Sequence, residues 1–122
     1  ASDARNSDGS GVLTFRSGDT LTYSRVITAN ATAYTAKAGA RTASGRVASV
    51  GCVAVDRKVI PMGSKLYITT PNGKIVYGTA VAADTGGAIK GNIVDLWFPS
   101  FADCRSWGRR NVTVYILDRK SS

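Results

Sequence analysis

Short segments of alternating polarity, separated by turn residues, are the feature that most limits how this chain can fold. Apolar and polar residues alternate over residues 65–70, the turn Pro71-Asn72-Gly73 follows, and residues 75–83 form a second apolar-rich segment. This pattern predicts a β-hairpin. Comparable segments follow one another at about eight to twelve residues, a spacing typical of all-β barrels and sandwiches rather than of βαβ folds.

One short helix is predicted near the end of the chain. Ser100 is a good N-cap, because Asp103 stands three residues later, as in a capping box, and Gly108 stands where the helix would stop. The other segments with a regular polarity pattern alternate as β-strands do. The further strands are expected at residues 12–15, 21–27, 31–36, 51–56 and 112–117, with a turn at 17–19 and a loop at 37–45.

A single domain fits the length of 122 residues. Residues 1–11 mix Ser, Asp, Asn and Gly without apolar spacing, which predicts a disordered or linker tail. Residues 12–122 are expected to form the domain. No stretch approaches the roughly 20 apolar residues that a membrane-spanning helix needs, so we expect no membrane span.

The residue types present exclude several kinds of chemistry. The chain contains no His, Glu or Gln, and eight Asp face sixteen Lys and Arg, for a formal charge of +8. Catalytic triads and zinc sites that need His are therefore excluded, and proton transfer falls to Asp. The basic excess favours a polyanionic partner such as nucleic acid, teichoic acid or peptidoglycan, and charge alone does not choose among them.

Cys52 and Cys104 are the two cysteines of the chain. A disulfide between them would close a loop of about 50 residues and would stabilise the fold by roughly 4 kcal/mol by restricting the unfolded chain. Such a pair would also indicate an exported protein. The alternative is two small buried thiols in a reducing compartment.

Three of the aspartates stand out by position. Asp56, Asp84 and Asp95 each follow directly on apolar, strand-like residues, where an ionised carboxylate is unfavourable unless it is paired. A turn-capping role would explain any one of them alone. Carboxyl groups that cluster among apolar neighbours raise one another's pKa, which lets one stay protonated near neutral pH as a general acid. We therefore predict that the three meet in one open cleft.

The segment that begins at Asp84 allows two other interpretations. Asp84-Thr85-Gly86 matches the active-site tripeptide of aspartic proteases, and a chain with one such motif would have to act as a dimer. The later apolar turn of those enzymes is poorly matched, since Asp118 stands where Gly is expected. Residues 85–91 are glycine-rich but lack the Walker A and G-x-G-x-x-G patterns, so no nucleotide site is expected.

Three motifs in order resemble a known family. They are VAVD at residues 53–56 with IPMGSKLY at 60–67, AADTGGAIKGN at 82–92, and VDLWF at 94–98. Together they resemble the three-aspartate (3D) domain of Gram-positive cell-wall and stationary-phase survival proteins. That family is similar to the catalytic barrel of membrane-bound lytic transglycosylase A. The resemblance, which runs from about residue 31 to residue 118, implies an all-β fold: a small double-psi β-barrel of about six or seven strands with one short helix.

The resemblance also implies an activity. This is lytic cleavage of peptidoglycan at the β-1,4 bond between N-acetylmuramic acid and N-acetylglucosamine, which leaves a 1,6-anhydromuramic end and needs no metal or other cofactor. By motif position, Asp95 is implied as the catalytic acid and base, with Asp84 and Asp56 as its charged or hydrogen-bonding supports. The implied substrate-binding residues are Thr85, Gly87, Lys90, Tyr34 and Thr35.

The implied partners are peptidoglycan glycan strands, at the bacterial exterior, for a secreted or wall-associated protein. A homodimer or a fused wall-binding module would supply the second wall of a glycan groove. A non-catalytic wall-binding barrel, whose aspartates only hydrogen-bond sugar hydroxyls, remains an alternative. Nucleic-acid binding is another, although aromatic and basic residues interleave little. Trp97 and Trp107 could stack on sugars, but Trp near strands and helices is more often a core residue.

Overall fold

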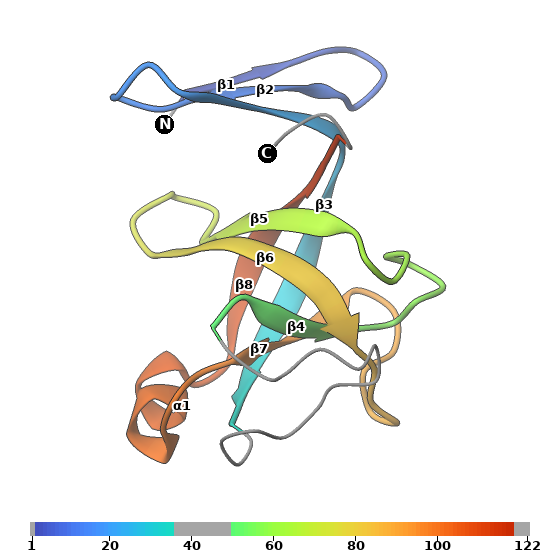
Figure 1. The fold of residues 1–122 in the computed structure, drawn as a ribbon, viewed down its shortest axis with the longest axis vertical. Helices are drawn as coiled ribbons and strands as arrows, with labels where there is room; N and C mark the ends of the chain where they lie inside the picture. The colour runs from blue at the N-terminus through green and yellow to red at the C-terminus, as the bar shows by residue number, and fades with distance from the viewer. Residues whose placement is uncertain (1, 36–49, 119–122) are drawn as a thin grey trace.

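A closed six-stranded barrel forms the body of the molecule (Figure 1). The computed structural model describes residues 2–35 and 50–118, which contain eight strands and one helix. Six strands pair in the order β3-β7-β4-β6-β5-β8, and β8 pairs back with β3 to close the barrel. The strands are β1 (Ser2–Arg5), β2 (Gly11–Thr14), β3 (Thr20–Tyr34), β4 (Cys52–Val55), β5 (Lys65–Thr69), β6 (Val76–Asp84), β7 (Ile93–Trp97) and β8 (Arg110–Leu117).

The barrel interior follows from the two-residue period of the strands. Side chains two positions apart point to the same face of a sheet, and each of the six strands contributes such residues to one apolar core. Val53 and Val55 of β4, and Val94 and Leu96 of β7, are 1% exposed or less. The expected all-β barrel with one short helix is therefore confirmed, and the predicted hairpin around residues 71–73 is formed by β5 and β6.

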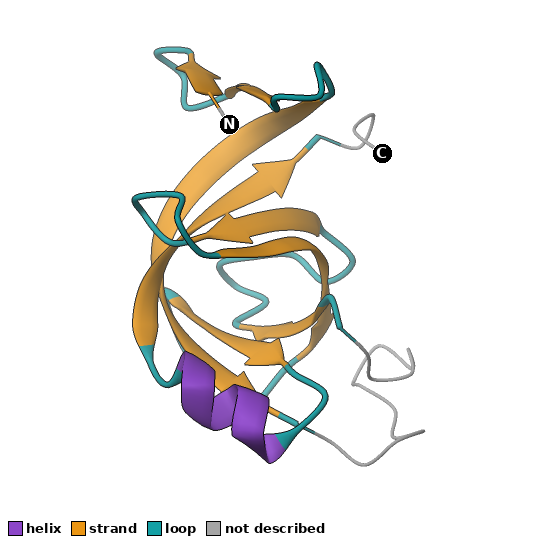
Figure 2. Cartoon of the chain, turned by 90° about the vertical axis from the view of Figure 1, so that its left-hand side faces the viewer, coloured by secondary structure: helices purple, strands orange, loops and turns teal. Residues whose placement is uncertain are grey.

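The helix forms where its caps predict it. Helix α1 (Phe101–Trp107) begins after Ser100, whose hydroxyl accepts a hydrogen bond of 3.1 Å from the Asp103 N–H. It ends at Gly108, which adopts a positive φ of 64° that favours glycine. Trp107 is buried in the barrel core and its indole N–H donates to the Ala31 carbonyl at 3.3 Å. This anchor holds α1 across one end of the barrel (Figure 2).

Strand β3 differs from the sequence-based expectation of two separate strands. It is one strand of 15 residues that runs from the top layer down the height of the barrel (Figure 1). No Gly or Pro interrupts the segment, and pairing with β8 continues through it. A β-bulge leaves Ser24 without a partner in the β8 ladder, because Tyr23 pairs with Leu117 and Arg25 with Ile116. The predicted loop at 37–45 lies outside the described residues.

The start of the chain is part of the sheet, so the expectation of a disordered or linker tail over residues 1–11 is wrong for the residues described there. Strand β1 pairs antiparallel with β2. Between them Gly9 has a φ of 90°, and the Asp8 carboxylate accepts the Ser10 N–H at 3.0 Å. All four residues of β1 are exposed, so no apolar periodicity marks this strand. Among the described residues, no helix is long and apolar enough to cross a membrane.

Gly11 gives a direct test of the β1–β2 hairpin. A Cβ at this position would overlap the Ala4 carbonyl oxygen and the Tyr23 phenol. We expect Gly11→Ala to lower the free energy of unfolding by about 1–3 kcal/mol in urea denaturation, because the close packing would be forced apart. Gly87→Ala is the matched control, with no atom within 4 Å of its Cβ and an expected change within about 0.5 kcal/mol. Equal stability of Gly11→Ala and the wild type would contradict the packing described.

Candidate functional site

Strand β4 lies between two strands that each carry a carboxyl group on the outer face of the barrel. Ala54 pairs with Asp95 of β7 on one side and with Asp84 of β6 on the other. Residues directly opposite each other on neighbouring strands point to the same face. The neighbours of Ala54 along β4, Val53 and Val55, point into the core. The two carboxyl groups therefore flank the small Ala54 side chain and face away from the core.

A β-bulge in β6 brings Asp84 into this row. Val53 pairs with Ala82, but Ala54 pairs with Asp84, so that Ala83 is left out of the register. Without the extra residue, Ala83 would stand opposite Ala54. Bulges often lie next to active sites and re-aim one side chain in this way. The bulge therefore puts an acidic residue where a regular ladder would have put Ala83.

Asp95 is held half-buried in the middle of β7. Thr32 of β3 stands directly opposite it and donates a hydrogen bond of 2.7 Å to its Oδ1. Burial raises the pKa of Asp95 above its ordinary value, and the nearby charge of Asp84 raises it further, while the Thr32 hydroxyl acts in the lowering direction. The carboxyl group is therefore biased toward the protonated form that a general acid requires.

A second row of side chains on the same face makes the site partly apolar. Tyr34 pairs with Trp97 across β3 and β7, and both pack with the buried Cys52. The Tyr34 hydroxyl donates a long hydrogen bond of 3.5 Å to Asp84 Oδ2. Burial and then the charge of Asp84 hold the pKa of Tyr34 well above its ordinary value, which keeps it a neutral donor. The buried indole N–H of Trp97 has no hydrogen-bond partner within the described part of the chain.

Asp56 does not join this carboxyl pair. Its Oδ2 accepts the Gly91 N–H at 2.9 Å, and its Oδ1 accepts the Lys58 N–H at 3.0 Å. These two bonds, led by that from Gly91, lower its pKa, and the charges of Lys90 and Lys58 act in the same direction. Asp56 thus stays ionised and ties the loop after β4 to the loop between β6 and β7. Of the three predicted carboxylates, two lie together and the third positions a neighbouring loop.

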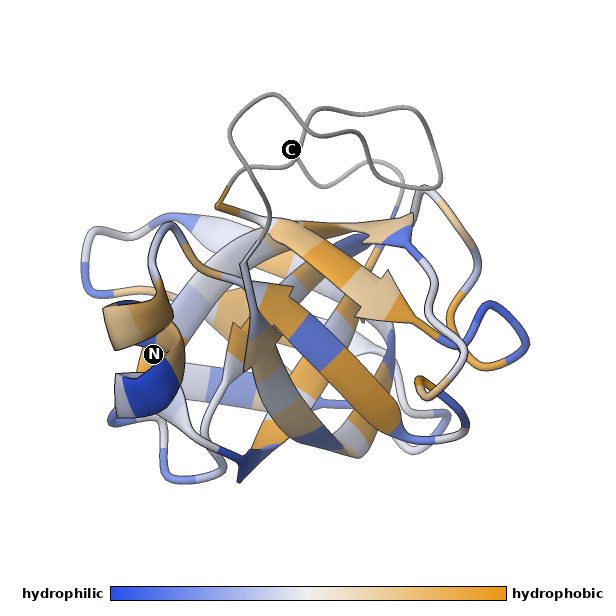
Figure 3. Ribbon diagram, turned by 90° about the horizontal axis from the view of Figure 1, so that it is seen from below, coloured by the Kyte–Doolittle hydropathy of each residue, from blue (hydrophilic) through white to orange (hydrophobic). Residues whose placement is uncertain are grey.

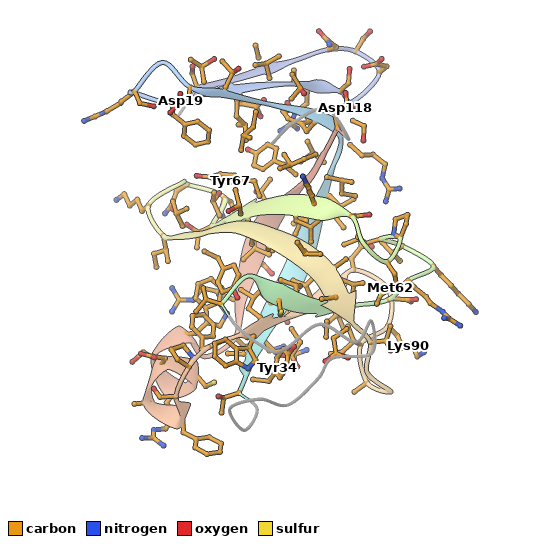
Figure 4. The ribbon with its side chains drawn as sticks, viewed as in Figure 1. Asp19, Tyr34, Met62, Tyr67, Lys90 and Asp118 are labelled. Carbon is orange, nitrogen blue, oxygen red and sulfur yellow. The ribbon has the colours of Figure 1, made fainter. Side chains whose placement is uncertain are left out.

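The loop that Asp56 holds lines a hollow of about 430 Å³. Asp56, Thr85, Gly87 and Lys90 contribute to its wall, and the last three are exposed. The Thr85 N–H donates a hydrogen bond of 2.9 Å to Asp84 Oδ1, and this bond connects the hollow to the carboxyl pair. Figure 4 shows Lys90 and Tyr34 at the same end of the molecule, and in Figure 3 hydrophilic segments interrupt the apolar strands of this end.

Five further residues singled out in the sequence complete the comparison. Thr35 is half-buried just beyond the end of β3. Cys52 and Cys104 carry thiols and are not joined by a disulfide. Trp97 and Trp107 are 8% and 7% exposed, so both are mainly core residues. Thr32 was not predicted, although its alternation with Tyr34 in the segment 31–36 would have placed the two on one face.

The hydrogen bond from Thr32 gives a prediction for the acidity of Asp95. Because this bond stabilises the carboxylate, Thr32→Val should raise the pKa of Asp95 further. The carboxyl carbon shift of Asp95, followed by NMR over a pH series, measures it. Thr28→Val, at an exposed position of the same strand, should leave the titration unchanged. An unchanged or lower pKa in Thr32→Val would contradict the role given to this bond.

The two kinds of carboxyl environment also predict opposite effects on stability. Folding raises the pKa of Asp95. The contribution of Asp95 to the stability of the folded state is therefore complete at a pH below its pKa in the unfolded chain, and it is lost as the pH rises through its pKa in the folded protein. Asp95→Asn should therefore be more stable than the wild type at about pH 8, with a difference that shrinks toward about pH 3. Asp56→Asn should be less stable at neutral pH, since its pKa is lowered. Thermal unfolding across pH tests both; a destabilised Asp95→Asn would contradict the first.

Comparison with known proteins agrees with this geometry. Residues 51–118 match the model of the 3D domain. Cell wall-binding protein YocH of Bacillus subtilis (strain 168) is 44% identical over 102 residues, which cover 78% of this chain. The match covers 33% of YocH, so this chain spans about a third of that relative's length.

Solved structures of MltA from Escherichia coli share the fold. One is 29% identical with a TM-score of 0.56, and the match covers 70% of this chain and 28% of MltA. Another, crystallised with bound chitohexaose, is 30% identical with a TM-score of 0.54 and covers 67% of this chain and 28% of MltA. MltA is described as a lytic transglycosylase. The family match covers more than half of the chain, and the chain belongs to the 3D domain family.

Proposed function

We propose that this domain is a peptidoglycan lytic transglycosylase. It would cleave the β-1,4 bond between N-acetylmuramic acid and N-acetylglucosamine and leave a 1,6-anhydromuramic end. The observation that carries the proposal is the half-buried Asp95 carboxyl, whose pKa is raised beside Asp84. The fold likeness to the lytic transglycosylase MltA, including a form with bound chitohexaose, supports it.

The reaction needs one carboxyl group that acts twice. Protonated Asp95 donates its proton to the glycosidic oxygen while the bond from that oxygen to the muramyl anomeric carbon breaks. The Asp95 carboxylate then accepts the proton of the C6 hydroxyl of the same sugar, and the C6 oxygen bonds to the anomeric carbon. Asp95 ends protonated, as it began, and no water is consumed.

The neighbours of Asp95 suit both halves of this cycle. The negative charge of Asp84 favours the protonated form of Asp95 at the start and stabilises positive charge at the anomeric carbon as the bond breaks. The Thr32 hydroxyl donates to Asp95 and stabilises the carboxylate formed in between. Tyr34 and the Thr85 N–H hold Asp84 in place. The apolar packing of Trp97 and Cys52 limits water beside the reacting bond.

The hollow beside Asp56 would take the adjoining sugar of the strand. Gly87 has open space where a Cβ would lie, so a ligand can approach its backbone. Lys90 can meet a carboxylate of the wall polymer. Since peptidoglycan lies outside the cell membrane, we place the protein at the bacterial exterior. A homodimer or a fused module would complete the groove.

A non-catalytic wall-binding role is the second candidate, favoured by the name of the relative YocH, a cell wall-binding protein. In that case the aspartates would only accept hydrogen bonds from sugar hydroxyls. The match to the aspartic-protease tripeptide, by contrast, lies within the residues that match the 3D domain model, and family membership accounts for it.

Digestion of purified peptidoglycan distinguishes these roles. The wild type should release muropeptides with anhydro ends, identified by mass spectrometry, and Asp95→Asn should be at least about 100-fold slower, since general acid–base catalysis contributes at least this much. Asp19→Asn, at an exposed turn, should keep full activity. Hydrated ends would identify a hydrolase instead. Binding without any released muropeptide would support the wall-binding role.

The activity should also depend on the protonation of Asp95. Because the acid form starts the reaction, the rate should fall as pH rises through the raised pKa of Asp95. In Thr32→Val the rate should fall at a higher pH than in the wild type, by the same shift that NMR gives for the pKa of Asp95. A rate that is flat over this range, or a fall that Thr32→Val leaves in place, would contradict Asp95 as the acid.

A further inference from the structure

A second groove lies at the other end of the molecule from the carboxyl pair. It has a volume of about 610 Å³ and is formed between the β1–β2 hairpin and the barrel strands β5 and β8. Figure 4 shows Tyr67, which lines this groove, on the side of the hairpin, whereas Tyr34 lies toward the opposite end. None of the residues predicted to act in catalysis or substrate binding lines it.

Three aromatic rings form one wall of this hairpin groove. Phe15 follows β2, Tyr67 lies on β5 and Tyr115 lies on β8, and all three are only partly buried. The rings of Phe15 and Tyr67 meet edge to face with centroids 5.3 Å apart, and those of Tyr67 and Tyr115 are 6.2 Å apart. Side chains far apart in the sequence thus form a continuous aromatic surface that remains open to a ligand.

Polar side chains stand beside these rings. Arg5 donates a hydrogen bond of 2.7 Å to Asp3 Oδ2, and the Tyr23 hydroxyl donates to the other Asp3 oxygen. Asn72 also lines the groove. Its Oδ1 accepts hydrogen bonds from the Thr70 hydroxyl and the Lys74 N–H, and neither bond uses the Asn72 side-chain NH₂. Guanidinium, carboxylate and amide groups each offer two donors or two acceptors in a fixed plane.

A small apolar cluster fixes this arrangement before any ligand arrives. Tyr23 is 1% exposed and packs with Leu13, Leu21 and Leu117 beneath the hairpin. The Tyr23 ring also contacts Tyr115, with centroids 5.1 Å apart. The polar rim and the aromatic wall are therefore attached to the same packed unit. A site formed in advance loses little entropy when it binds.

We propose that the hairpin groove is a second binding site for a glycan strand. A pyranose ring presents C–H groups on its faces and hydroxyl groups at its edge. Aromatic rings match the faces, and planar polar groups match adjacent hydroxyls. Asp3 and Arg5 pair with each other, and Arg16 is the remaining charged side chain of the groove lining. A single cation is a weak site for a phosphate polymer, whereas the three rings offer a sugar chain its main contact area. That the chain is peptidoglycan rests on the proposed function.

Two sites on one domain would strengthen attachment to a polymer that repeats the same sugars. Once one site holds a strand, the other meets nearby sugars at a high effective concentration. The groove would then keep the domain on the wall while the carboxyl pair releases one product. This role requires binding in the groove but no chemistry there.

The test uses Asp95→Asn as the background, so that ligand is not consumed. Chitohexaose, added during NMR of the labelled protein, should shift two separate sets of backbone signals: one around Thr85 and Lys90, the other around Phe15 and Asn72. Adding Tyr67→Leu should abolish the second set alone, and Tyr67→Phe should keep both because the ring remains. Phe15→Ala is a second variant with the same expectation as Tyr67→Leu, in case that variant unfolds.

Sedimentation with purified peptidoglycan gives the matching affinity. Tyr67→Leu and Phe15→Ala should weaken binding at least about tenfold, the loss expected when one of two linked contacts is removed. Phe101→Ala removes an aromatic ring that is 73% exposed on α1 and should change nothing. Shifts around Thr85 alone would overturn the second site and leave the proposed function standing. Shifts around Phe15 alone would support the second site and count against glycan binding at the carboxyl pair. Binding of a phosphate polymer but not of chitohexaose would also overturn the second site.

Discussion

The hydrogen-bond ladders on the two sides of β4 are the interaction on which the site depends. This strand has four residues, but it lies between β6 and β7 and fixes the register of both. Tyr77 supports it at one end, since its hydroxyl accepts the Gly51 N–H at 3.0 Å and donates to the Trp97 carbonyl at 2.7 Å. The relative positions of residues Asp84 and Asp95 are therefore set by backbone pairing. Sites on strands can hold geometry more tightly than sites on loops.

The charges of the site divide its aspartates into two kinds. Asp95 is placed where ionisation is unfavourable, and Asp56 where two N–H groups stabilise its ionised form. The first arrangement destabilises the folded protein at neutral pH and suits proton transfer. The second stabilises the loops around it. Functional sites commonly lower stability in the first way, and supporting contacts offset the loss.

Much of the fold could be predicted from local sequence, because alternation, turn residues and helix caps are local signals. The helix between Ser100 and Gly108 and the hairpin around Asn72 are examples. Strand β1 lacked such a signal, because its residues are exposed and only the Asp8-Gly9 turn marked it. The unity of β3 was missed because the polar Thr28 and Asn30, on either side of the small Ala29, resemble a break between two strands.

The sequence singled out the residues of the candidate site, but it did not show which of them lie together. Motif position singled out Asp56, Asp84 and Asp95, yet the separation of Asp56 follows from its bonds to Gly91 and Lys58. Which carboxyls meet depends on strand pairing between segments about 40 residues apart, such as β4 with β7. The bulge at Ala83 brings Asp84 opposite Ala54. Nothing in the apolar sequence of this segment distinguishes a bulged strand from a regular one. The resemblance to a family indicated these residues, but only the structure shows which strands pair and therefore which carboxyl groups lie together.

The bulge at Ser24 reverses which side of β3 faces inward. Before it, Leu21 and Tyr23 pack under the hairpin, and after it the residues of the same parity, Ala29 and Ala31, fill the barrel interior. One strand can thus belong to two cores on opposite faces. Loss of a single residue here would turn one half of the strand inside out. Length variation in this domain should therefore be confined to its turns, and the hairpin cannot be lengthened or shortened from within β3.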